Sequence, residues 1–174
     1  MQKYYANLLS WLAMSLTITA IILVGFNKLS IIYAIIAVMI AAILDMFDGK
    51  VARHFLNKKE DFIFGEITDS LCDTINFGIV PVLIYINIFS NNSLIILIGI
   101  TIFYLWAVVY RLARFSKTKI ELKVKYYQGV PVTVASPLLV LLFIPLQNNF
   151  MVGSIGMVVL AFLMISKIKV KKIW

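Results

Sequence analysis

The sequence predicts an all-α polytopic membrane protein, and three observations support this fold class. Hydrophobic residues make up 62% of the 174 residues and charged residues only 14%, with a mean hydropathy of +0.98. This composition is too apolar for an ordinary soluble domain. The apolar residues also gather in six runs, each close to the roughly 20 residues that a helix needs to cross a bilayer. The strict alternation typical of a membrane β-barrel is absent. We therefore expect six transmembrane helices.

The six predicted helices follow one another with short links between them. In chain order they cover Leu8–Phe26, Leu29–Ala52, Ile67–Phe89, Leu94–Tyr110, Pro131–Leu146 and Phe150–Ile165. Polar turns such as Ser90–Ser93 separate some of them, and the longest stretch outside the membrane, Ser116–Gln128, is predicted to be a basic loop. No linker or soluble segment interrupts the series. We therefore expect a single membrane domain over residues 1–174.

The basic residues predict the orientation of these helices. If the N-terminus is cytoplasmic, the outer turns carry only Lys28, and the other 15 of the 16 lysines and arginines lie on the inner links and ends. Such a bias is typical of cytoplasmic segments. Both termini are thus predicted to be cytoplasmic, and the formal charge of +8 becomes a feature of the membrane surface. Because no soluble basic face is predicted, no nucleic-acid partner is expected.

Four aspartates stand out against this apolar background. Asp45 and Asp48 come late in the second run, and Asp69 and Asp73 lie early in the third. A carboxylate within a bilayer costs roughly 2.5–3.5 kcal/mol even on the insertion scale that gives the lowest values. Four clustered carboxylates therefore indicate a function or a bound counter-ion.

Helical periodicity places these acids on two narrow polar faces. At about 100° per residue, one face holds Asp45, Asp48, Gly49 and Ala52, and the other holds Gly65, Asp69, Asp73 and Asn76. A turn near Lys58 and Lys59 would set the faces opposite each other at the cytoplasmic edge of the bilayer. Asp45 would then face Asp73, Asp48 would face Asp69, and Arg53 would lie near Gly65, where the missing side chain leaves room.

Four facing carboxylates can coexist only if they are protonated or bind cations. Oxygen ligands with no histidine or cysteine beside them suit Mg²⁺, Mn²⁺ or Ca²⁺. Two divalent ions would cancel four negative charges, and the small residues Gly49 and Ala52 leave volume for a bulky phosphate-bearing ligand. The pattern favours metal-assisted phosphoryl transfer.

At these positions the chain resembles the CDP-alcohol phosphatidyltransferase family, whose motif reads D-x₂-D-G-x₂-A-R, a spacer, then G-x₃-D-x₃-D. All eight fixed positions match, namely Asp45, Asp48, Gly49, Ala52, Arg53, Gly65, Asp69 and Asp73. The spacer, residues 54–64, is longer than is usual in the family. The resemblance implies a CDP-linked lipid donor, release of CMP, a pair of Mg²⁺ or Mn²⁺ ions and a homodimer.

The resemblance also implies roles for individual residues. The metal ligands would be Asp45, Asp48, Asp69 and Asp73, and Asp73 would also be the catalytic base that takes the proton of the alcohol. Residues implied to bind the CDP-lipid are Asn7, Gly49, Ala52, Arg53 and Gly65. The neighbouring Glu66 remains open between pairing with a loop lysine and supporting the acids.

The segment from Asp69 to Pro81 resembles the phosphatidylserine synthase branch of the family, which reads D-S-x₂-D-x₃-F-G-x₂-P, and residues 110–115 and 127–133 agree. This branch implies L-serine as the acceptor and CDP-diacylglycerol or CDP-archaeol as the donor. Serine carries a carboxylate, so its site needs a cation. The candidates for serine binding are Asn76, Arg111 and Arg114. Each has a structural alternative, helix–helix hydrogen bonding for the asparagine and membrane-surface anchoring for the arginines.

Two further alternatives remain at this stage. Within the family, the acceptor could be glycerol 3-phosphate or inositol phosphate, which would need a denser cationic pocket. Outside the family, acids could line the path of a cation transporter or channel. Such a path should continue across the membrane, yet the outer parts of the predicted helices carry no ionisable residue except Lys28. A membrane scaffold without enzymatic activity does not account for four acids at these spacings.

Overall fold

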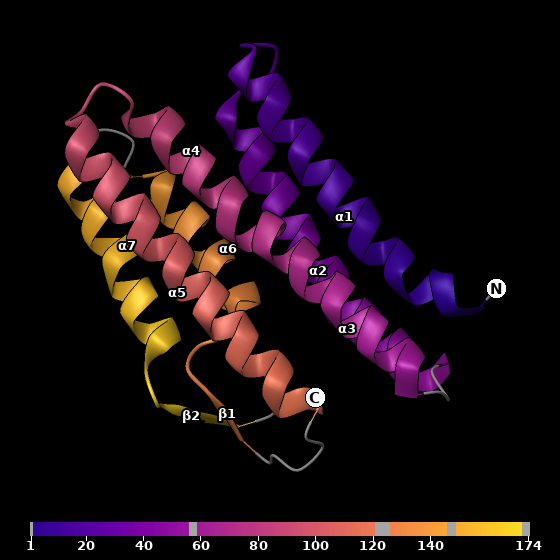
Figure 1. Ribbon diagram of the computed structural model, residues 1–174. Coiled ribbons are helices and arrows are strands. Elements are labelled where there is room, and N and C mark those ends of the chain that lie inside the picture. The colour runs from indigo at the N-terminus through magenta and orange to yellow at the C-terminus, as the bar shows by residue number, and fades with distance from the viewer. Residues whose placement is uncertain (1, 56–58, 121–125, 146–148, 172–174) are drawn as a thin grey trace.

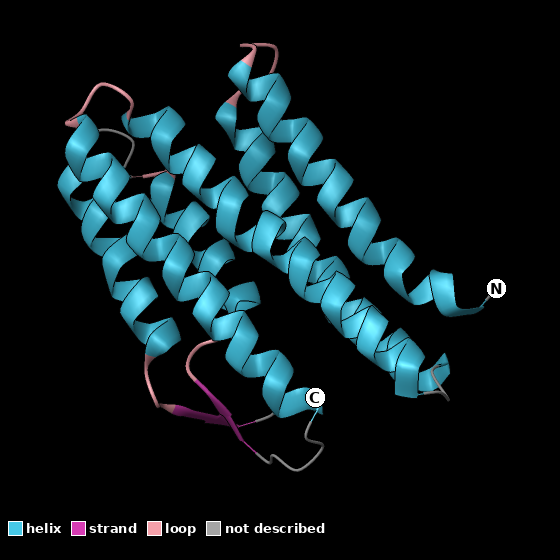
Figure 2. Cartoon of the chain, in the orientation of Figure 1, coloured by secondary structure: helices cyan, strands magenta, loops and turns pink. Residues whose placement is uncertain are grey.

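The computed structural model describes residues 2–55, 59–120, 126–145 and 149–171, with side chains for residues 8–47, 64–116, 129–145 and 149–168. Nearly all of this part of the chain is helical (Figure 2). The elements in chain order are α1 Gln2–Gly25, α2 Ile31–Phe55, α3 Lys59–Asp73, the π-helix η1 Thr74–Ile79, α4 Val80–Phe89, α5 Leu94–Ile120, β1 Tyr126–Gln128, α6 Val132–Phe143, α7 Phe150–Ile165 and β2 Lys169–Lys171.

The predicted helical class is confirmed. Because α3, η1 and α4 follow one another without a break, the described residues form six helical rods (Figure 1). Within the described part of the chain, three segments are long and apolar enough to cross a membrane: Leu8–Gly25, Phe64–Phe89 and Leu94–Ser116. The described parts of the other rods include shorter apolar helices, Ile31–Phe47, Val132–Phe143 and Phe150–Ile165. Large hydrophobic side chains are exposed along all six rods, as in a multi-pass membrane protein.

The links between the rods gather at two opposite ends of the bundle. The turn after α1 and the turn between α4 and α5 lie at one end (Figure 1). The N-terminus, the last turns of α5 and the two strands lie at the other end (Figure 1). Basic residues are concentrated at this second end, where α5 and β2 carry lysines in their last residues. We call it the basic end.

Two expectations about the basic end need correction. The helix α5 continues to Ile120, so the predicted loop 116–128 begins as helix and ends as the strand β1. No strand was expected in an all-α chain, yet the C-terminal lysine run contains β2, which pairs antiparallel with β1. The backbone N–H of Gly129 donates to the carbonyl of Ile168 at 2.8 Å and extends this pairing. Because backbone groups beyond the helix ends still need partners, a short ladder forms where the sequence shows no strand periodicity.

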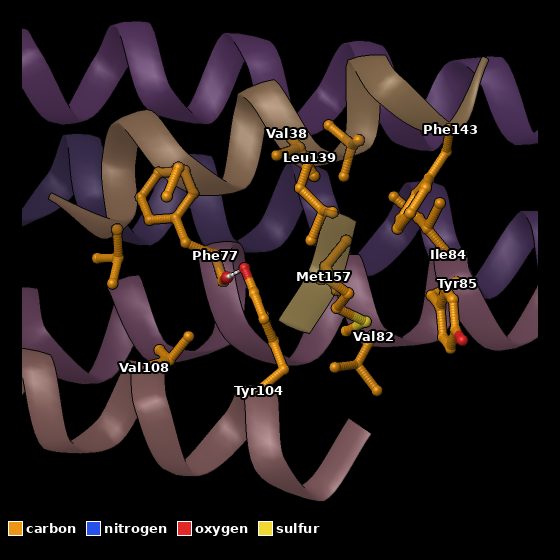
Figure 3. Packing of buried hydrophobic residues seen from close by; sticks show 14 of the residues in the cluster. Val38, Phe77, Val82, Ile84, Tyr85, Tyr104, Val108, Leu139, Phe143 and Met157 are labelled. Atoms are coloured by element: carbon orange, nitrogen blue, oxygen red, sulfur yellow. Dashed lines mark hydrogen bonds between the residues drawn. The ribbon is translucent and has the colours of Figure 1, made fainter. Parts of the chain in front are cut away.

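The core of the bundle is formed where η1 packs against α5 and α6, and α7 packs against the same two helices. Phe77, Tyr104, Leu139 and Met157 are each fully buried there (Figure 3). The only cysteine of the chain, Cys72, is 3% exposed and lies on α3 just before η1.

The π-helix η1 has a local cause in Pro81. Proline has no N–H, so the carbonyl of Phe77 loses the donor that the residue four positions later normally supplies. The hydroxyl of Tyr104 on α5 donates to this carbonyl at 3.0 Å (Figure 3). The backbone N–H of Val80 reaches back five residues to the carbonyl of Ile75, which is the π-helical pattern. The result is a local change of helical twist immediately after Asp73.

Candidate active site

Three of the four predicted metal ligands converge in the structure. One carboxylate oxygen from each of Asp45, Asp69 and Asp73 lies within 4.8 Å of the other two. Asp45 and Asp69 are half-buried, and Asp73 is 8% exposed. The three side chains come from two helices, α2 and α3, that are joined by a short link. We call this group the carboxylate cluster.

The local sequence explains why the cluster forms. Asp69 and Asp73 are four residues apart on α3, so they lie on one face of that helix, one turn apart. Helix α1 packs against both α2 and α3, which holds the faces of these two helices together. The predicted proximity of Asp45 and Asp73 is thus found in the structure, whereas the predicted pairing of Asp48 with Asp69 involves a side chain outside the described residues.

The remaining motif residues lie at the C-terminal part of α2 and the start of α3. Asp48, Gly49, Ala52 and Arg53 belong to α2, but their side chains lie outside the described residues. Asp48 follows Asp45 by three positions on the same helix, so it lies one turn nearer the basic end. Gly65 is half-buried in the second turn of α3, and Asn7 belongs to α1, with its side chain outside the described residues.

Asn76 lies about one turn beyond Asp73, inside the π-helix. It is 2% exposed, and its Oδ1 accepts a hydrogen bond of 2.7 Å from the hydroxyl of Thr17 on α1. The same hydroxyl lies 3.0 Å from the carbonyl of Met14 in its own helix. Asn76 therefore makes the helix–helix hydrogen bond that was one alternative for it. This contact ties the helical segment just beyond Asp73 to α1.

A second polar network lies between α3 and α5. The hydroxyls of Ser70 and Ser116 are 2.7 Å apart, and Ser116 donates to Oε1 of Glu66 at 3.4 Å. Glu66 is 4% exposed. The structure therefore gives Glu66 a partner on α5 and makes it part of the contact that holds α3, and with it the carboxylate cluster, against α5.

Arg114 caps the end of a neighbouring helix. Its Nη1 donates to the carbonyl of Ile165 at 3.3 Å, and its Nη2 donates to the carbonyls of Met164 and Ser166 at 3.2 Å each. The last carbonyls of a helix have no partner within the helix, and a cation there interacts favourably with the helix dipole. These bonds give Arg114 a structural role at the C-terminus of α7.

Arg111 and Gly129 also contribute to the packing of α5 against the segment that follows β1 and against the end of α7. Arg111 is 3% exposed, its Nε donates to the carbonyl of Val130 at 3.2 Å, and its guanidinium lies 4.9 Å from the ring centroid of Phe115. Gly129 has a φ of 80°, and a Cβ at this position would overlap the carbonyl oxygen of Met164 and lie 2.8 Å from Nη2 of Arg114. Only glycine satisfies both the conformation and the close approach.

Comparison with known proteins agrees with this geometry. Residues 3–167 match the profile of CDP-alcohol phosphatidyltransferase. The chain belongs to the CDP-alcohol phosphatidyltransferase family. A relative from Methanocaldococcus jannaschii, named CDP-diacylglycerol–serine O-phosphatidyltransferase, is 35% identical over 155 residues, which cover 89% of this chain and 69% of the relative. The family predicted from the motif is confirmed. The chain is therefore a transferase, and the transporter and scaffold alternatives are not favoured.

Sequence reasoning missed several residues that shape the site of this transferase. Thr17 and Tyr104 belong to no recognised motif, and each forms a hydrogen bond with η1 from another helix. The position of Pro81, four residues after Phe77, is the signal that could have indicated an irregular turn. The cap by Arg114 joins residues about 50 positions apart in the chain, and a local sequence pattern cannot indicate such a contact.

Proposed function

We propose that this family member transfers the phosphatidyl or archaetidyl group of a CDP-activated lipid to the hydroxyl of L-serine and releases CMP. The observation that carries this proposal is the carboxylate cluster. One carboxylate oxygen from each of Asp45, Asp69 and Asp73 lies within 4.8 Å of the other two, and all three residues belong to the motif of the family. The serine acceptor is supported by the name of the M. jannaschii relative and by the residues from Asp69 to Pro81 that follow the branch pattern.

The residues of the cluster fit a divalent metal site. Three carboxylates at this separation repel one another strongly unless cations or protons compensate them. Their donor atoms are all oxygens, which are the ligands that Mg²⁺ and Mn²⁺ prefer. We propose that Asp48 is the fourth ligand and that Mg²⁺ or Mn²⁺, two ions per site, is held by the four aspartates. Such ions would neutralise the diphosphate of the donor and the charge that develops on it during transfer.

The transfer itself is a substitution at the phosphorus that carries the lipid. The oxygen of the serine hydroxyl forms a bond to this phosphorus, and the bond from phosphorus to the oxygen of the CMP group breaks, so that CMP leaves. Asp73 takes the proton of the serine hydroxyl, as a general base. It lies one turn beyond Asp69 and is 8% exposed, whereas Asp45 and Asp69 are half-buried.

The donor would lie across the ends of α1, α2 and α3. We propose that Asn7, Gly49, Ala52, Arg53 and Gly65 contact the CDP-lipid, with the small residues giving the nucleotide room. The lipid chains would extend into the bilayer beside α2 and α3. The serine side is proposed to include Asn76 and Arg111, whereas Arg114 is assigned to the cap of α7.

The proposal also includes orientation and assembly. We propose that the basic end faces the cytoplasm, because basic segments are retained on that side, and that the carboxylate cluster is open to the same side. All six rods would then cross the membrane, with both termini inside, in a single domain that forms a homodimer in the cell membrane.

Purified protein in detergent tests the proposal directly. Labelled serine and a CDP-lipid should give labelled phospholipid and an equal amount of CMP, and glycerol 3-phosphate or inositol phosphate should give much less. Thorough dialysis against EDTA should abolish both products, and Mg²⁺ or Mn²⁺ should restore them. A higher rate with glycerol 3-phosphate would reject serine while leaving the family intact, and full activity in EDTA would reject the metal site.

A further inference from the structure

The contact between Thr17 and Asn76 decides which way the carboxamide of Asn76 is oriented. The hydroxyl of Thr17 lies 2.7 Å from Oδ1 of Asn76 and 3.0 Å from the carbonyl of Met14. A hydroxyl has one proton to donate, and the shorter of the two contacts is the one to Asn76. The oxygen of the carboxamide is thus directed toward α1 and held there.

The nitrogen of the same carboxamide must point away from α1, because the oxygen and nitrogen lie on opposite sides of the planar group. Among the residues whose side chains the structure describes, Thr17 is the bonding partner of Asn76. The residue is 98% buried in the π-helix that follows Asp73. The amide nitrogen carries two N–H groups that can donate to an acceptor.

Electrostatics favours the same orientation. The carboxylate cluster lies about one turn away along the same helical segment, and substrates of this site carry phosphates and, for serine, a carboxylate. An amide N–H group is attracted to such anionic oxygens, and a carbonyl oxygen in its place would be repelled. The π-helix that carries Asn76 is itself held from a third helix, since Tyr104 bonds the carbonyl of Phe77.

We propose that Thr17 is a positioning residue that holds the Asn76 carboxamide with its N–H groups available to an anionic oxygen of a bound substrate. The inference rests on the proposed function. The anionic oxygen could belong to the carboxylate of serine or to a phosphate of the CDP-lipid, and we expect the former. Thr17 itself touches no substrate.

The decisive comparison is between Thr17→Val, which keeps the shape and removes the hydroxyl, and Thr17→Ser, which keeps the hydroxyl. In the proposal, Thr17→Val raises the KM for serine about tenfold or more, as expected when a hydrogen bond to a charged group is lost, while kcat changes little. Thr17→Ser should restore the KM. A rise in the KM for the CDP-lipid alone would support the proposal with the phosphate as the ligand.

Thr101→Val is the matched control. Thr101 is 7% exposed, and its hydroxyl bonds the carbonyl of Ile98 three residues earlier, as the hydroxyl of Thr17 approaches Met14. Its loss removes a buried hydroxyl without affecting Asn76, so the KM values should stay unchanged. The proposal is overturned if Thr17→Val leaves both KM values at the wild-type level, even if the variant has a lower kcat or a lower thermal stability.

Failure of the serine assignment can be told apart from failure of this inference. If another alcohol supports CMP release in the wild type, serine is wrong as the acceptor, and the same variants are compared with that alcohol. Independently of activity, thermal unfolding of Thr17→Val, Asn76→Ala and the double variant measures the coupling between the two side chains. Full additivity in this cycle would also overturn the inference.

Discussion

The hydroxyl of Tyr104 donates to the backbone carbonyl of Phe77, 27 residues earlier in the chain, at 3.0 Å. Both residues are fully buried. The bond compensates for the N–H that Pro81 lacks. Helix α5 thereby stabilises the π-helix η1, which begins directly after Asp73. A side chain from one rod thereby sets the local twist of another.

Replacing Tyr104 by phenylalanine should leave the carbonyl of Phe77 without this donor. A buried acceptor that loses its partner typically costs about 1–3 kcal/mol, so the temperature of thermal unfolding in detergent should fall. Tyr33→Phe is the control, because Tyr33 is 53% exposed on α2. Equal unfolding temperatures for the two variants would contradict the role assigned to Tyr104.

Loss of a single carboxylate should remove metal binding. Asp69→Asn takes one negative charge from the cluster and weakens the ligand set for a divalent ion, so both turnover and the stabilisation of the protein by added Mn²⁺ should be lost. Asp61→Asn is the matched control, since Asp61 lies on the same helix two turns earlier and outside the motif. The metal site would be wrong if the two variants behaved alike.

Asp73→Asn separates the role of base from that of ligand. As the base, Asp73 contributes about 10²–10⁴ in rate, so turnover at saturating Mg²⁺ should fall by this factor while the affinity for the CDP-lipid is nearly retained. If Asp73 mainly holds a metal, turnover and CDP-lipid affinity should fall together. Turnover close to that of the wild type would remove Asp73 from the mechanism.

Gly129→Ala should destabilise the basic end. Its φ of 80° costs an L-residue about 1–2 kcal/mol, and the new methyl group would overlap the carbonyl of Met164. Gly99→Ala in α5 is the control, because a Cβ there meets nothing within 4 Å and alanine favours the helix by up to about 1 kcal/mol. Thermal unfolding of both variants should show a clear loss for the first and none for the second.

Arg114→Lys tests whether this arginine caps α7 or binds serine. Lysine keeps the charge, but its single ammonium nitrogen lacks the planar geometry with which two guanidinium nitrogens reach the three carbonyls. We therefore expect a lower unfolding temperature and an unchanged KM for serine. A raised KM for serine at unchanged stability would indicate instead that Arg114 binds serine.

Much of the site followed from periodicity. Residues four apart on a helix share a face, and two faces joined by a short link must meet, which is why Asp45, Asp69 and Asp73 could be placed together. The π-helix could not be predicted in this way, because it depends on Tyr104 as well as Pro81. Likewise, strands of three residues such as β1 are too short for alternation to show, and the cap by Arg114 depends on the packing of α5 against α7.

The burial of Cys72 makes the chain well suited to chemical mapping of its own topology. With the single native thiol 3% exposed, a membrane-impermeant maleimide should react only with a cysteine introduced on the surface. Lys28 and Lys167 are exposed, the first in the turn after α1 and the second just beyond α7. Labelling of one position and protection of the other in sealed inside-out vesicles would reveal which compartment the carboxylates face, without altering a residue of the site.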